Sequence, residues 1–112
     1  MSSKICHVVL FSLNKARLQA AFPSESDLQR QLQSIRANVP GVLEIQMGPA
    51  ASALYEGYVM CNGEYTHCLV SKHLDAEALR MYVTHPVHVA FAQQLVAASE
   101  KPLTRIDFEI KE

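Results

Sequence analysis

The sequence has no excess of charge of either sign, which argues against a nucleic-acid or anionic-membrane partner. Its 10 lysines and arginines nearly balance 11 aspartates and glutamates, and no long block of like charge interrupts the chain. No apolar run approaches the roughly 20 residues of a transmembrane helix, and the N-terminus lacks the basic start of a signal peptide. We therefore expect no nucleic-acid or membrane partner and a cytoplasmic location.

Cysteine is scarce and unpaired. Cys6, Cys61 and Cys68 are odd in number and form no C-x-x-C motif, so neither a disulfide framework nor a thiolate zinc site is indicated. Several histidines could converge on a metal ion, but the chain has no H-E-x-x-H or carboxylate-assisted pattern. We expect neither a metal nor a cofactor.

The periodicity that is present predicts one small domain of alternating strands and helices. Strands are expected at 5–13, 42–47, 65–71 and 103–110, because β-branched and alternating apolar residues gather there. Amphipathic helices are expected from a cap at Ser24 or Ser26 to Val39, and from a cap at Asp75 through a break at Pro86 to Ser99. The last strand is expected to turn Ile106, Phe108 and Ile110 toward the core, and the segment at His73 to be a solvated turn.

The order β-α-β-β-α-α-β is that of an α+β, ferredoxin-like fold, with the first and third strands at the centre of the sheet. Helices would cover one face of this sheet. The other face would remain open, and the apolar residues on both sides of the first strand would make it a large exposed patch. A face-to-face homodimer is the simplest way to bury it.

The most informative stretch, from Tyr82 to Phe91, places two imidazoles and a phenol around a proline. Proline cannot continue a helix but suits the first turn of a new one, so His85 should end one helix and His88 should begin the next. The positive end of the second helix disfavours an imidazolium, which would keep His88 neutral and able to act as a base.

With these residues in view, the chain resembles the Dabb family, the stress-responsive dimeric α+β barrel proteins. The resemblance extends nearly end to end, as one Dabb (stress-response A/B barrel) domain over residues 1–112, and implies a ferredoxin-like protomer whose sheet pairs with that of its twin. The motifs that carry it are His7–Phe11, Pro40-Gly41, Asp75–Leu79, the run Tyr82-x-x-His85-Pro86-x-His88, and Asp107-Phe108.

Within that family, the polar positions resemble polyketide cyclases of the olivetolic acid cyclase type, which close a ring by aldol condensation. The resemblance implies catalytic roles for Tyr82 and His88, and substrate-binding roles for His7, His67 and His85 in a mostly apolar pocket. The leading hypothesis is therefore a small apolar or polyketide-like ligand, with acid–base catalysis of the aldol type. The alternative is a non-catalytic stress-responsive dimer, in which the same side chains only cap the core at the proline break.

Overall fold

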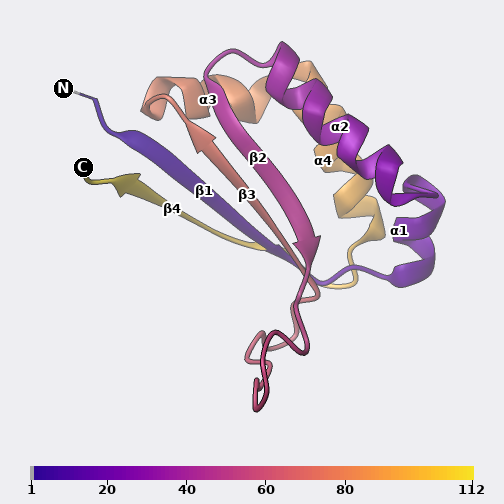
Figure 1. Cartoon of the computed structure of the whole chain (residues 1–112). Helices are drawn as coiled ribbons and strands as arrows, with labels where there is room; N and C mark the ends of the chain where they lie inside the picture. Colours follow the sequence, from indigo (N-terminus) through magenta and orange to yellow (C-terminus); the bar gives the residue numbers. More distant parts are fainter. Residues whose placement is uncertain (1) are drawn as a thin grey trace.

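A four-stranded antiparallel sheet carries helices on one of its faces (Figure 1). The structure, a computed structural model of the chain, describes residues 2–112. The elements in chain order are β1 (Lys4–Phe11), α1 (Lys15–Ala21), α2 (Glu25–Asn38), β2 (Val42–Pro49), β3 (His67–His73), α3 (Ala76–Thr84), α4 (Pro86–Ala98) and β4 (Thr104–Ile110). The predicted α+β, ferredoxin-like class is confirmed.

The strands lie in the order β2-β3-β1-β4, so β3 and β1 are central, as predicted. In β1, His7 lies opposite Ser71 of β3 and opposite Asp107 of β4. Because side chains alternate along a strand, these three residues share one face of the sheet. It is the face beneath the helices, because Val9 and Phe11 of the same set belong to the core.

The predicted helix caps are present. Ser24 and Asp27 form a capping box at the start of α2, and the Asp75 carboxylate accepts the backbone N–H of Ala78 at the start of α3. His85 ends α3 and caps α4, with Pro86 in the first turn. The predicted break therefore lies where the sequence indicated.

Three predictions about the elements need correction. Helix α1 was not predicted, because none of its seven residues is buried and no apolar period marks it. Strand β3 begins and ends two residues later than predicted, so His73 pairs with Ile5 and Val42 in the sheet and is fully buried rather than solvated.

The third correction concerns β4, whose apolar residues do not face the helix-covered core. Ile106 lies opposite Val8, on the open face, and Ile106 and Phe108 are 65% and 52% exposed. The alternation itself was right, but alternation within one strand does not say which face is the covered one.

The loop between β2 and β3 projects beyond the end of the sheet (Figure 1). In the part of the chain described, residues 2–112, no helix is long and apolar enough to cross a membrane.

Candidate functional site

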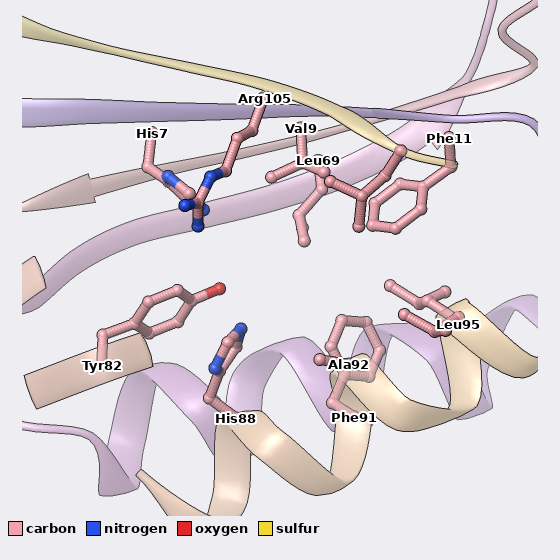
Figure 2. A pocket seen from close by; sticks show the side chains of 12 residues that line it. His7, Val9, Phe11, Leu69, Tyr82, His88, Phe91, Ala92, Leu95 and Arg105 are labelled. Atoms are coloured by element: carbon pink, nitrogen blue, oxygen red, sulfur yellow. The ribbon is translucent and has the colours of Figure 1, made fainter. Parts of the chain in front are cut away.

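A cavity of about 110 Å³ lies between the sheet and the helices α3 and α4, beside the edge strand β4. Figure 2 shows its two ends: ring nitrogens, a guanidinium and a phenol gather at one, and aliphatic and phenyl side chains at the other. This volume is somewhat smaller than that of a cavity that encloses a benzene ring, but the space is partly open to solvent, so a longer molecule need not fit wholly inside it. Its lining is His7, Val9, Phe11, Leu69, Tyr82, His88, Phe91, Ala92, Leu95, Val96, Leu103 and Arg105.

Four rings are packed together at the polar end, around Tyr82. The centroid of the Tyr82 ring lies 3.9 Å from that of His88, 4.6 Å from that of His73 and 5.9 Å from that of His7. These residues come from α4, β3 and β1, while Tyr82 comes from α3. The cluster therefore exists only when the helix pair packs on the two central strands.

The proline break determines which nitrogen of His88 is free. In an unbroken helix the Val83 carbonyl would accept the N–H of Val87, but that N–H donates instead to Nδ1 of His85 at 3.2 Å. His88 Nδ1 lies 3.2 Å from the Val83 oxygen, and since a carbonyl only accepts, Nδ1 carries the proton. Burial lowers the pKa of His88, so the ring is neutral near pH 7 and its Nε2 is an unprotonated base.

The Tyr82 hydroxyl is the unsatisfied group of the site. Tyr82 is 0% exposed, and its hydroxyl has no hydrogen-bond partner within residues 2–112. Figure 2 shows that hydroxyl directed into the cavity. Burial raises the pKa of Tyr82 to about 12, and the nearby Ser71 hydroxyl, which is hydrogen-bonded to His73, partly opposes this rise. The phenol is therefore a neutral donor at physiological pH.

His7 is held by a carboxylate. Its Nδ1 is hydrogen-bonded to Oδ1 of Asp107, the residue opposite it on β4. The carboxylate accepts, so Nδ1 is the donor, and the pair holds the ring in place at the cavity wall.

Ser71 and His73 form a buried polar pair beneath Tyr82 that sequence reasoning missed. The Ser71 Oγ and the His73 Nε2 are 2.8 Å apart, and both residues are fully buried. Burial is the main cause that lowers the pKa of His73 to about 4, and the neighbouring His7 contributes to the same shift. The signal was present in the sequence, because Ser71 and His73 continue the alternation begun by Leu69.

Two of the five predicted site residues lie outside the cavity. His67 pairs with Phe11 at the far end of β3, four residues or about 13 Å from the position opposite His7. His85 caps α4 through its Nδ1 and does not line the cavity. The structure brings together His7, Tyr82 and His88, and it adds His73, Asp107 and Arg105. Arg105 and Asp107 lie at the site because of the register between β4 and β1, and no local sequence motif indicates that register.

A metal site is not assembled by this cluster. Within residues 2–112, no group of three or more histidine, cysteine, aspartate or glutamate side chains is arranged to hold an ion. The site's own residues supply a neutral base (His88), a neutral hydrogen-bond donor (the Tyr82 phenol) and a cation (Arg105).

Comparison with solved structures shows the same fold in proteins of low sequence identity. A dimeric ferredoxin-like protein from Bacteroides fragilis is 20% identical, with 96% of each chain covered and a TM-score of 0.69. The hydroxynitrile lyase from Passiflora edulis is 16% identical, with coverage of 100% of this chain and 97% of that one and a TM-score of 0.67. A Dabb family protein from Mesorhizobium loti is 24% identical, with 95% of each chain covered and a TM-score of 0.64.

None of the curated proteins matches the chain. The family model for the Stress responsive A/B Barrel Domain, Dabb, matches residues 5–110. This span contains all eight helices and strands except Lys4, the first residue of β1. The chain is a member of the Dabb family.

Proposed function

We propose that the chain is a homodimer whose cavity binds a small molecule, and that His88 and Tyr82 catalyse proton transfer at a carbon flanked by carbonyl groups. The reaction class is aldol condensation of the polyketide cyclase type. The observation that carries this proposal is the Tyr82 hydroxyl, which is buried, has no protein partner and points into the cavity. An unpaired buried hydroxyl costs about 1–3 kcal/mol, a cost that a ligand oxygen would remove.

The first step is removal of a proton by His88. Its Nε2 takes the proton, and the electron pair of the broken C–H bond forms the C=C bond of an enolate. The negative charge goes to the carbonyl oxygen, where the Tyr82 O–H donates a hydrogen bond. The enolate carbon then attacks a second carbonyl carbon of the same substrate molecule and forms the new C–C bond. The resulting alkoxide takes the proton back from His88.

The protonation states suit these roles. Burial lowers the pKa of His88, so the base is free at neutral pH, and raises the pKa of Tyr82 to about 12, so the donor keeps its proton. A carbon between two carbonyls is acidic enough for such a base. Proton transfer of this kind contributes typically about 10²–10⁴-fold to a rate.

The open face of the sheet supports the homodimer. Val8 lies between Val70 and Ile106 on that face, and Phe108 beside them is 52% exposed. Similar structures include dimers of this fold, among them the Bacteroides fragilis protein. A second copy would cover this apolar surface.

The similarity to a hydroxynitrile lyase supports only the statement that this fold accommodates catalysis. Fold by itself does not transfer a reaction. For this chain the proposal therefore depends on the cavity residues and needs a direct test.

The test is exchange of the C2 protons of 3-oxooctanoate and its methyl ester for deuterium, followed by proton NMR. The wild-type protein should accelerate exchange above the buffer rate. His88→Gln should lose about 10²-fold or more of this acceleration, because the base is gone. Tyr82→Phe should lose a comparable factor, because the enolate oxygen loses its donor.

A second readout separates function from folding. Tyr82→Phe removes a hydroxyl that bonds to nothing in the fold, so its melting temperature should equal or exceed that of the wild type. Tyr55→Phe, in the projecting loop, is the matched control and should exchange at the wild-type rate. Acceleration that survives both His88→Gln and Tyr82→Phe would remove these two residues from the mechanism, and no acceleration by the wild type would leave the non-catalytic dimer as the better account.

A further inference from the structure

We infer that the ligand of this cavity is an anion with an apolar tail, a medium-chain carboxylic acid, and that Arg105 binds its carboxylate. The inference uses the cavity of the proposed function, but it concerns binding alone and does not need the proton transfer to occur. No motif in the sequence points to Arg105, whose place at the cavity follows from the pairing of β4 with β1.

The first step is the position of Arg105. It lies opposite Val9 of β1, so its side chain is on the helix-covered face of the edge strand, and it lines the cavity. Figure 2 shows the guanidinium extending from β4 toward the space into which the Tyr82 hydroxyl and the His88 ring point. A flexible cation is thus placed at the same end of the cavity as the reactive pair.

The second step is that this cation has no partner in the protein. Within residues 2–112, Arg105 takes part in no ion pair and no side-chain hydrogen bond. The acidic residue next to it on the same face of β4, Asp107, is paired with His7. Arg105 is exposed on the edge strand, so its guanidinium, with donors in a fork that matches a carboxylate, is accessible to a ligand at this end of the cavity.

The third step is the division of the cavity into two ends. The polar end holds Arg105, His7, Tyr82 and His88, and within it the Tyr82 hydroxyl is a second unused donor. The other end is walled by aliphatic and phenyl groups, which offer nothing to a polar ligand. Those residues are Phe11, Leu69, Phe91, Leu95 and Leu103. A ligand that satisfies both ends has an anionic head beside a hydrogen-bond acceptor and an apolar tail.

The two classes of neutral ligand fit less well. A wholly apolar molecule would leave the Tyr82 hydroxyl buried without a partner, and a neutral polar one could accept hydrogen bonds from the guanidinium but would not compensate its charge. Hydrogen bonds to a charged group are worth roughly 1.5–3 kcal/mol, which corresponds to about 10- to 100-fold in affinity.

The experiment compares octanoate with octanamide, which has nearly the same shape but no charge, by isothermal titration calorimetry. The wild type should bind octanoate at least 10-fold more tightly than octanamide. Arg105→Gln should abolish this preference, and Arg105→Lys, which keeps the charge but not the fork, should retain part of it. Arg36→Gln, which removes a cation from the exposed surface of α2, is the matched control and should keep the full preference.

Several outcomes would overturn the inference: equal affinity for the two probes, a preference that survives Arg105→Gln, or no binding of either probe at millimolar concentration. Octanoate selectivity through Arg105 without catalysed deuterium exchange would refute the proposed function and leave this inference standing. Catalysed exchange that is equal for 3-oxooctanoate and its methyl ester, with no preference for octanoate over octanamide, would refute this inference and leave the proposed function standing.

Discussion

At the scale of single residues, burial sets the protonation states of the cavity. Loss of water is the largest cause of the lowered pKa of His88, the lowered pKa of His73 and the raised pKa of Tyr82. All three groups are therefore uncharged at neutral pH. A neutral base beside a neutral phenol is the pair that enolate chemistry needs, and it comes from packing without any metal ligand set.

The same burial makes stability depend on pH through His73. Its pKa is about 4 in the folded chain against 6.5 for the free side chain. Between these values the unfolded chain binds a proton that the folded chain does not, so the free energy of unfolding should fall as pH falls from 6.5 to 4. The contribution of His73 to this loss should be at most about 3 kcal/mol.

Urea unfolding at pH 7 and pH 4.5 measures this effect, with His73→Gln as the variant. Glutamine does not titrate and can still bond to Ser71, so the variant should lose less stability between the two pH values than the wild type. His67→Gln is the control: His67 is only partly buried and its pKa is lowered mainly by that burial, so its removal should change the pH dependence less. If the wild type and His73→Gln lost the same free energy of unfolding between pH 7 and pH 4.5, His73 would not be the source of the pH dependence.

At the scale of elements, the site depends on how closely α3 approaches the sheet, because α3 carries Tyr82. Gly41, just before β2, permits that approach. Its φ of +84° suits glycine, and a Cβ there would lie 2.5 Å from the Cβ of Ala78 in α3. The backbone N–H of Leu74 also donates to the Gly41 carbonyl, at 2.9 Å, just before α3 begins.

Gly41→Ala should therefore lower the free energy of unfolding by about 2–5 kcal/mol, the sum of backbone strain and overpacking. Gly57→Ala is a matched control, since Gly57 has a φ of +83° but nothing within 4 Å of a Cβ. It should show only the strain, about 1–2 kcal/mol. Chemical denaturation measures both, and equal losses would show that the contact with Ala78 is unimportant.

At the scale of the whole molecule, the two faces of the sheet differ in what they carry. The face under the helices holds the core and the cavity, while the open face presents Val8, Val70, Ile106 and Phe108. The edge strand β4 contributes to both, with Arg105 and Asp107 on one side and apolar residues on the other. Dimerisation through the open face would therefore leave the lining of the cavity within each protomer.

Val8→Glu tests this arrangement, because Val8 is at the centre of the open face between its two cross-strand neighbours. A buried, unpaired carboxylate at a dimer interface should give monomer or aggregate by light scattering. Ala37→Glu, on the exposed surface of α2, should remain dimeric. A Val8→Glu dimer of unchanged mass would refute the face-to-face arrangement.

Much of the fold follows from local patterns. The capping residues Ser24 and Asp75 and the break at Pro86 determine where helices begin and end, because they act on backbone groups within a few residues. Helix α1 escaped prediction since it buries none of its residues. The C-terminal end of β3 was not predicted, because the strand continues to His73 through pairing with both β1 and β2, which are distant in the sequence.

By itself, the sequence determined the fold class, the helix break and the presence of Tyr82 and His88 at one corner, since these depend on spacing along the chain. Only the tertiary structure decided which histidines share a cavity. The register of β1 with β3 and β4 puts Ser71 and Asp107 opposite His7 and leaves His67 at the other end of the sheet. Register is a long-range property, and a period of two is compatible with any shift by two residues. For this reason Arg105, His73 and Asp107 could be assigned to the site only after the strands were paired.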